Sequence, residues 1–292
     1  MGVCRPDARC KRDGSIIGII PRMDYELGII GAGNMAEAIV RGILRAGLLD
    51  ASQIIAADVA ASRRALFQNE LGIKAVEENT AVASASRRLL LSVKPQQIEA
   101  ALAGIGAVMS IETRVISIMA GISTTYIETH LGVGKSWRVI RTMPNTPMLV
   151  GEGMVGICTG KHATASDLAD AIKLFETAAT VIEVTEDKID AVTALSGSGP
   201  AYFFYFVEHM IRAGESLGLT AEQAKMMAIK TAVGAAKMLG TSTDSPVELR
   251  RKVTSPGGTT QAAINHLEQH EAGEILAAAI NAAAKRSGEL GI

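Results

Sequence analysis

Short apolar runs alternate with helix-like stretches along the chain from residue 25 onward. Several of these runs are apolar at nearly every position, which is typical of strands covered by helices on both faces. The pattern predicts strands at residues 27–30, 54–57, 89–93, 114–119, 137–141, 154–158 and 181–184. Because helices separate the strands, we expect an α/β domain over residues 25–186 with a doubly wound, Rossmann-like and mostly parallel sheet.

Helix signals replace strand signals from residue 187 to the end of the chain. Thr220 and Ser245 are each followed three positions later by Gln or Glu, a pattern in which a hydroxyl caps the start of a helix. Pro246 suits the first position of such a helix. The pattern therefore predicts an all-helical domain over residues 187–292.

Two alanine-rich stretches of this helical domain, residues 231–236 and 275–284, are too apolar for a small bundle with every face exposed. They predict either contact with a second subunit or burial in an ordinary core within the chain. The first alternative makes the protein a homo-oligomer.

The first 24 residues differ from the rest of the chain because they are basic and lack periodicity. Their only apolar stretch, residues 15–20, is too short for a secretory signal. We expect a disordered extension, or a start codon placed upstream of a working start at Met23. An organelle transit sequence is the alternative.

Composition excludes several classes of partner. The formal net charge is -1 and no basic stripe is present, so nucleic acid is not an expected partner. No apolar run approaches the roughly 18 residues of a membrane span, so no membrane association is expected. Cys4, Cys10 and Cys158 show neither a CxxC pair nor metal-ligand spacing, which predicts no metal site, no disulfide framework and a reducing, cytoplasmic location.

Residues 31–36, GAGNMA, directly follow the first predicted strand and open the next helix. In such a turn the first glycine permits a tight bend, the second lets the backbone approach a pyrophosphate, and the third small residue lets helix and strand pack closely. Free N–H groups at the helix start attract the phosphates. The position predicts dinucleotide contacts at Gly31, Ala32, Gly33, Asn34 and Met35.

Asp58 ends the second predicted strand, where a carboxylate can accept a hydrogen bond from the 2′-hydroxyl of the adenosine ribose. The same carboxylate would repel a 2′-phosphate, which favours NADH. Arg63 and Arg64 follow, and they either bind that phosphate or form a solvated helix start. The sequence alone leaves the choice between NADH and NADPH open.

Three further segments follow predicted strands and would meet the same edge, since parallel strands present their carboxyl ends together. They are residues 92–95 (SVKP), 120–123 (AGIS) and 142–147 (TMPNTP). Two prolines stiffen the last segment, whose amide at Asn145 and hydroxyl at Thr146 could hold a nicotinamide carboxamide. Their shared position favours a binding site over three unrelated turns.

Two small-residue loops open helices in the helical domain, residues 196–200 (SGSGP) and 255–260 (SPGGTT). The N–H groups at such helix starts attract anions such as a carboxylate, and the hydroxyls of Thr259 and Thr260 can donate further hydrogen bonds. Without further knowledge, loops of this kind are as often helix caps as binding sites.

In this order and context, these loops closely resemble those of the pyrroline-5-carboxylate reductase family, whose enzymes make L-proline. The resemblance runs from about residue 25 to residue 285 and includes GIIGAGNMAEAI (28–39), SVKPQQI (92–98), RTMPNTPMLVGEG (141–153), ALSGSGPAYFF (194–204) and LRRKVTSPGGTTQAAINHLE (249–268). It implies a dinucleotide-binding domain and a helical domain that forms an interlocked homodimer. It also implies further assembly of dimers into rings such as a decamer, with the active site between the cofactor edge of one subunit and helices of the dimer.

The resemblance further implies roles for single residues. Pyrophosphate contacts fall at residues 31–35. The other cofactor contacts are Asp58 and Asn79 on the adenosine side, and Val93, Lys94, Ala120, Asn145, Thr146 and Pro147 on the nicotinamide side. The implied substrate-binding residues are Glu186, Ser255, Gly257, Gly258, Thr259 and Thr260, with Thr260 as the catalytic residue that hydrogen-bonds the ring nitrogen. Asp58 departs from the small polar residue that many relatives carry there.

The implied reaction is hydride transfer from NADPH or NADH to the imine carbon of (S)-1-pyrroline-5-carboxylate, the last step of proline biosynthesis. A protonated imine is already electrophilic, so the reaction needs orientation more than a strong acid or a metal. One alternative is a β-hydroxyacid dehydrogenase, whose catalytic lysine would be Lys225, Lys230 or Lys237. The other is a non-catalytic, nicotinamide-binding regulatory dimer.

Overall fold

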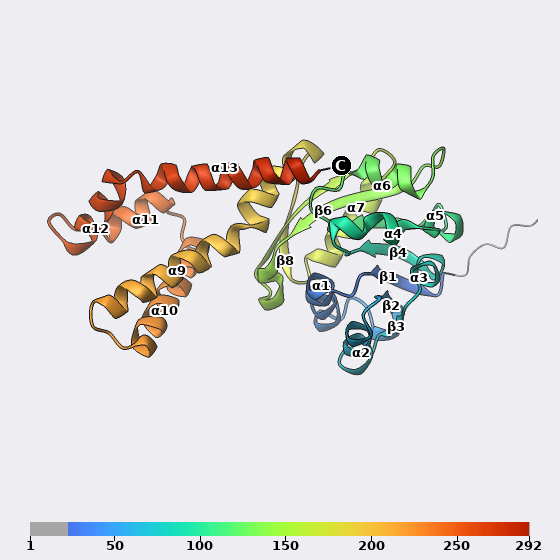
Figure 1. Ribbon diagram of the computed structural model, residues 1–292, viewed down its shortest axis with the longest axis horizontal. Coiled ribbons are helices and arrows are strands. Elements are labelled where there is room, and N and C mark those ends of the chain that lie inside the picture. The colour runs from blue at the N-terminus through green and yellow to red at the C-terminus, as the bar shows by residue number, and fades with distance from the viewer. Residues whose placement is uncertain (1–22, 292) are drawn as a thin grey trace, which may run out of the picture.

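An eight-stranded sheet forms the N-terminal part of the protein in the computed structural model, which describes residues 23–291 (Figure 1). The strand order is β3-β2-β1-β4-β5-β6-β7-β8, and all neighbours are parallel except β6 and β7. The strands are β1 (Tyr25–Ile30), β2 (Ile54–Ala57), β3 (Lys74–Val76), β4 (Ser86–Leu91), β5 (Arg114–Ser117), β6 (Arg138–Pro144), β7 (Gly153–Thr159) and β8 (Ala179–Glu183). The extension predicted over residues 1–24 lies almost wholly outside the described residues.

The predicted doubly wound, mostly parallel sheet is confirmed, with differences in the bounds of its strands. Strand β6 runs to Pro144, so the first half of the loop predicted at residues 142–147 belongs to the strand, where it pairs with β7. The pattern missed β3, because it has three residues and only Ala75 is buried, too few for a recognisable apolar run. Strand β4 lies earlier than the predicted residues 89–93, because its first half contains Arg87 and Arg88 rather than apolar residues. Ser92 and Val93 already belong to the turn that follows β4.

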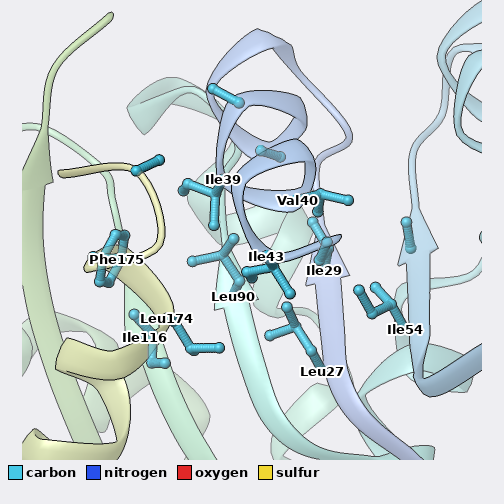
Figure 2. Close-up of a cluster of buried hydrophobic side chains, with 14 of the residues drawn as sticks. Leu27, Ile29, Ile39, Val40, Ile43, Ile54, Leu90, Ile116, Leu174 and Phe175 are labelled. Carbon is cyan, nitrogen blue, oxygen red and sulfur yellow. The ribbon is translucent and has the colours of Figure 1, made fainter. Parts of the chain in front are cut away.

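Two layers of helices cover the sheet, one on each face. On one face, α1 (Asn34–Arg45), α2 (Ala61–Asn69) and α7 (Ala165–Phe175) contribute to one buried cluster with alternate residues of the strands (Figure 2). On the other face lie α3 (Asn79–Ala85), α4 (Ile98–Leu102), α5 (Ile105–Val108) and α6 (Thr124–Leu131). Burial of both faces explains why the strands are nearly continuous apolar runs.

The chain is helical after β8 and forms an arm that extends away from the sheet (Figure 1). The arm comprises α8 (Ile189–Val192), α9 (Gly199–Ser216), α10 (Ala221–Thr241), α11 (Pro246–Lys252), α12 (Thr259–Gln269) and α13 (Ala272–Leu290). Thr220 and Gln223 form the predicted reciprocal cap of α10. The Ser245 hydroxyl caps α11 by accepting from the Glu248 amide.

The arm buries very little of its own apolar surface. Among the described residues of α9 to α13, only Gly199, Ala224, Ala228 and Ser287 are buried. Within the alanine-rich stretches, Val233 is 56% and Ile275 is 66% exposed. The interpretation of these stretches as an ordinary core within the chain is therefore wrong.

Three arginines occupy neighbouring register positions at the amino ends of β4, β5 and β6. Arg88 lies opposite Arg114, and Arg114 lies opposite Arg138. Asp170 of α7 accepts two bonds from Arg88, at 2.6 and 2.7 Å. Asp167, which is buried, accepts from Arg114 at 2.9 Å. Arg138 also lies 3.6 Å from Asp167, so these pairs join α7 to three strands and neutralise the like charges that the register brings together.

Replacement of Asp170 by Asn should make the protein less stable at neutral pH. The hydrogen bonds from Arg88 are the largest cause of the lowered pKa of Asp170, so its carboxylate stabilises the folded state fully above the ordinary pKa near 3.8. That contribution is lost as the pH falls through the folded pKa. We expect a deficit of about 1.5–3 kcal/mol in the free energy of unfolding at pH 7, shrinking below pH 4, in urea titrations.

The matched control is Glu152→Gln, which removes an exposed carboxylate from the same domain. Equal stability losses in the two variants, or a deficit for Asp170→Asn that does not change with pH, would contradict the assigned role of the ion pair.

Candidate active site

The turn after β1 is formed where the ends of three strands meet. The Gly31 amide donates to the Ala57 carbonyl at the end of β2, and the Ser92 amide donates to the Ile30 carbonyl, both at 2.8 Å. Gly31 has φ +93°, and a Cβ there would lie 2.6 Å from the Ser92 carbonyl oxygen. Only glycine fits this position, as the sequence pattern predicts.

The second glycine of the turn leaves space for a ligand. Gly33 precedes α1, and no side chain caps that helix. A Cβ on Gly33 would meet no atom within 4 Å, so packing inside the chain would allow a side chain at this position. Uncapped N–H groups beside open space fit the pyrophosphate of a dinucleotide. Ala36, the third small residue, is fully buried in the core beneath α1.

The carboxylate of Asp58 lies against this turn. Its Oδ2 accepts from the Ala32 amide and its Oδ1 from the Ala60 amide, each at 2.8 Å. These bonds fix the carboxylate at the carboxyl end of β2, while lone pairs remain to accept from a ribose hydroxyl. The geometry fits an adenosine ribose with free hydroxyls.

Both arginines near Asp58 have partners within the chain. Arg63 donates through Nε to the Ala32 carbonyl at 2.5 Å and pairs with Glu37 at 2.8 Å. Arg64 donates to the carbonyl of Asp58 at 2.8 Å and pairs with Glu77 at 3.3 Å. A 2′-phosphate would have to compete with these carboxylates for either guanidinium.

The other cofactor-side residues predicted from the sequence lie after the carboxyl ends of β3, β4 and β5, on both sides of β1 in the sheet. Val93 and Lys94 follow β4, and Val93 would touch a Cβ on Gly31. Ala120 lies in the turn after β5, and Asn79 begins α3, where its amide donates to the Ala101 carbonyl at 3.3 Å. These turns share one edge of the sheet.

Asn145 joins two of the predicted loops. Its Nδ2 lies 3.2 Å from both the carbonyl and the hydroxyl of Ser196, and its Oδ1 accepts from the Met154 amide at 2.9 Å. The side-chain amide of Asn145, which we expected to hold a nicotinamide carboxamide, therefore already has hydrogen-bond partners within the chain. Thr146 and Pro147 begin the short helical turn Thr146–Val150 next to it.

The segment around Ser196 is not the loop predicted from its glycines. A π-helical turn, Thr193–Gly197, leads almost directly into α9, and the Ser198 amide donates to the Thr193 carbonyl at 2.8 Å. Gly197 is needed for packing, since a Cβ would lie 2.6 Å from Cε of Met143. The small residues here let the arm approach the end of β6.

Glu186 lies at the junction of the sheet and the arm. Its Oε1 accepts from the Thr124 amide at 2.8 Å and from Nη1 of Arg141 at 3.2 Å, and its Oε2 accepts from the Thr124 hydroxyl at 2.8 Å. Both oxygens are thus bonded within the chain. The predicted contact of Glu186 with substrate stays a prediction. The sequence analysis missed Arg141. The signal that could have identified it is a charged residue within an otherwise apolar strand.

The SPGGTT loop has the features of an anion site. Gly257 has φ +69°, and Gly258 precedes α12 without a side-chain cap, so the first-turn N–H groups of that helix have no capping side chain. Ser255, Gly257 and Thr259 are exposed, and Thr260 is half-buried in the first turn. Uncapped N–H groups with flanking hydroxyls fit a carboxylate.

This loop lies far from the cofactor edge of the same chain. Helices α11 and α12 occupy the distal end of the arm, at the opposite end of the long axis from β1 and α3 (Figure 1). Helix α13 returns from that end to the sheet, where a Cβ on Gly121 would lie 2.9 Å from the Leu290 carbonyl oxygen. The predicted cofactor residues and the substrate residues of the SPGGTT loop therefore do not meet within one chain, whereas Glu186 lies next to the turn after β5.

Neither a metal-binding cluster nor a reactive thiol is found among residues 23–291. No group of three or more His, Cys, Asp or Glu residues could hold a metal in this part of the chain. Burial raises the pKa of the Cys158 thiol to about 11, with Glu186 as a further cause, so this thiol is a poor nucleophile. No helix in the same range is long and apolar enough to cross a membrane.

Comparison with known proteins gives a consistent result over both halves of the chain. A family profile described as pyrroline-5-carboxylate reductase dimerisation matches residues 186–290, and one described as NADP oxidoreductase, coenzyme F420-dependent, matches residues 26–121. Pyrroline-5-carboxylate reductase of Pseudomonas aeruginosa is 40% identical, with 90% of this chain and 96% of that protein covered. The enzyme of Methanosarcina acetivorans is also 40% identical, with 92% and 98% covered.

The chain belongs to the pyrroline-5-carboxylate reductase family. Solved structures agree: that of the Coxiella burnetii enzyme superposes with a TM-score of 0.85 at 36% identity, covering 92% of this chain and 99% of that one. The Plasmodium falciparum enzyme with NADP bound gives 0.82 at 27% identity, covering 93% and 100%. The predicted family, fold class and enzyme class are confirmed, and the family's dimerisation domain supports an oligomer.

Replacement of Gly33 by Val should strongly weaken cofactor binding without unfolding the protein. The new side chain meets no atom of the chain but fills the space beside the uncapped start of α1. We expect at least a tenfold weaker Kd for NADH and NADPH by fluorescence titration, with a thermal unfolding midpoint close to that of the parent. Undiminished binding would show that the pyrophosphate does not approach this turn.

Proposed function

We propose that this protein, as a member of its family, reduces (S)-1-pyrroline-5-carboxylate to L-proline at a site shared between two subunits. The observation that carries the proposal is the separation of two binding elements in one chain. The glycine turn at the sheet edge precedes the uncapped start of α1, and the SPGGTT loop at the distal end of the arm precedes the uncapped start of α12. A second copy of the chain brings these elements together.

The cofactor is a reduced nicotinamide dinucleotide, which supplies a hydride when bound. Residues 31–35 hold its pyrophosphate, Asp58 and Asn79 its adenosine side, and the turns after β4 and β5 its nicotinamide side. Asp58 favours NADH, because its carboxylate is fixed where a 2′-phosphate would lie and both nearby arginines are paired with carboxylates.

The substrate carboxylate binds the N–H groups at the start of α12, next to Ser255, Gly257 and Gly258. Thr259 and Thr260 lie in the first turn of that helix, and the Thr260 hydroxyl oxygen accepts a hydrogen bond from the protonated ring nitrogen. The chain thus contributes orientation and exclusion of water, which suffice because the imine carbon is already electrophilic. Glu186 is proposed to lie near the bound ring.

A homodimer follows from the same arrangement. A cavity of about 830 Å³ lies between the Asn145 loop and helices α9 and α10, and its walls include exposed Phe203, Phe204 and Val233. Helices of a second arm would fill this cavity and bury the apolar faces. Assembly of dimers into a decamer and a cytoplasmic location remain predictions.

The alternative of a β-hydroxyacid dehydrogenase is not favoured by the comparisons. Its candidate lysines, Lys225, Lys230 and Lys237, are exposed on α10 rather than gathered at the cofactor edge.

The first prediction here concerns turnover and cofactor choice. Purified protein mixed with pyrroline-5-carboxylate should oxidise NADH faster than NADPH, followed by absorbance. Asp58→Ser removes the carboxylate and should raise the ratio of kcat/KM for NADPH to that for NADH at least tenfold, about 1.4 kcal/mol. Oxidation of neither cofactor would overturn the proposed reaction. A parent enzyme that prefers NADPH would overturn only the role of Asp58.

The second prediction concerns Thr260. Thr260→Ala should lower kcat/KM for the imine by about 10- to 100-fold, because a hydrogen bond to the reacting nitrogen is lost. Thr260→Ser retains the hydroxyl and is the matched control, which should keep most of the activity. Equal activity of the two variants and the parent would remove Thr260 from the reaction.

The third prediction tests the shared site by complementation. Gly33→Val disables the cofactor element and Thr260→Ala the substrate element, so each homodimer has two defective sites. A refolded equimolar mixture should recover about a quarter of the parent activity, because half of the dimers are mixed and each has one intact site. A site formed within one chain predicts no recovery at any mixing ratio.

A further inference from the structure

An ion pair with one buried and one partly exposed partner lies next to the turn that contains Ala120. Arg141 of β6 is 7% exposed at its side chain and pairs with Glu186 at 3.2 Å. Its neighbours in the sheet are Ser117 and Cys158, neither of them charged. The Nε of Arg141 is buried and has no hydrogen-bond partner among the described residues. A buried guanidinium with an unmet donor is unfavourable for stability, so stability alone does not explain this arginine.

The pair acts on the chain through Thr124, the first residue of α6. Glu186 accepts from both the amide and the hydroxyl of Thr124, at 2.8 Å each. The turn of residues 120–123 immediately precedes this residue. On its other side the turn meets the end of α13, because Gly121 leaves no room for a Cβ beside Leu290. The turn is therefore held between the ion pair and the last turn of the arm.

We propose that Arg141 and Glu186 are positioning residues for hydride transfer. They hold Thr124, and through it the turn of residues 120–123, so that the backbone at Ala120 keeps the nicotinamide ring facing the substrate. The inference rests on the proposed function, which places the nicotinamide beside this turn. It assigns Glu186 a role within its own subunit and gives Arg141 a role in the reaction.

Changes in the ion pair should affect binding of the nicotinamide end of the cofactor and leave binding of the adenosine end unchanged. The adenosine and pyrophosphate elements lie on β1 and β2, and neither Arg141 nor Glu186 contacts Gly31, Ala32 or Asp58 by a hydrogen bond or ion pair. ADP-ribose, which lacks nicotinamide, probes only those elements, whereas NADH probes both. A general loss of protein stability would weaken the binding of ADP-ribose and NADH equally.

The experiment compares Glu186→Gln and Thr124→Val with the parent by calorimetric titration of NADH and ADP-ribose and by steady-state kinetics. We expect kcat to fall about 10- to 100-fold and the Kd of NADH to rise, because small displacements of a reacting group are costly. The Kd of ADP-ribose should stay within about twofold of the parent value. Thr124→Ser keeps the hydroxyl and should restore the parent behaviour.

Glu183→Gln, which removes an exposed carboxylate at the end of β8, is the matched charge control and should change neither kcat nor the Kd of NADH or ADP-ribose. Arg141→Met should reproduce the effect of Glu186→Gln. If Arg141→Met fails to fold, Thr124→Val still tests the proposal, because it removes one hydroxyl and keeps the shape of the side chain.

Three results would overturn the inference: parallel weakening of NADH and ADP-ribose, an unchanged kcat in Thr124→Val, or no rescue by Thr124→Ser. A parent enzyme that binds NADH but does not reduce the imine would overturn the proposed function instead. In that case the two titrations still show whether the ion pair acts on the nicotinamide end alone.

Discussion

The helical arm cannot bury its own apolar surface, and the rest of the molecule is arranged around that constraint. Helices α9 to α13 contain Phe203, Phe204, Met226 and Ile275, each more than 60% exposed. Full burial of such side chains stabilises a protein by about 1.5–3 kcal/mol each. An arm of this composition is stable when a second arm covers it, which is consistent with the dimerisation profile that matches residues 186–290.

The same constraint determines where chemistry can occur. Because the arm extends away from the sheet, the SPGGTT loop is distant from the turn at Gly31 in the same chain (Figure 1). Helix α13 then returns to the sheet and ends against Gly121, while the Ser287 hydroxyl donates to Asp190 of α8 at 2.7 Å. Each arm is thus anchored at the carboxyl edge of its own sheet at one end and carries the SPGGTT loop at the other.

Charged residues within the sheet are of two kinds, which differ in how completely their hydrogen-bonding groups are satisfied. The arginines at the amino ends of β4 to β6 are neutralised by Asp167 and Asp170, both of which have pKa values below the usual range. For Asp167, burial raises the pKa but is outweighed by bonds from Thr164 and Arg114. These pairs join α7 to the sheet. At the opposite edge, Arg141 keeps an unmet donor in a buried setting, as expected of a functional rather than a purely stabilising position.

Local patterns in the sequence determined the fold class and the binding elements. Apolar runs identified seven of the eight strands, because burial on both faces leaves a signal that needs no partner. Gly31 and Gly33 identified the tight turn after β1, because the bend leaves no room for a Cβ at Gly31, whereas a Cβ on Gly33 would face open space. Thr220 and Ser245 marked helix starts through bonds to residues three positions away.

Tertiary structure decided what depends on residues distant in the sequence. The partners of Asp58, Arg63 and Glu186 are set by the packing of separate elements, so no local pattern reveals that Glu186 caps α6 and pairs with Arg141. The glycines near Ser196 predict a loop, yet they serve packing against Met143. The separation of the two binding elements along the arm is likewise a property of three-dimensional arrangement. Sequence names the residues of each element, whereas only the fold shows that one chain cannot bring them together.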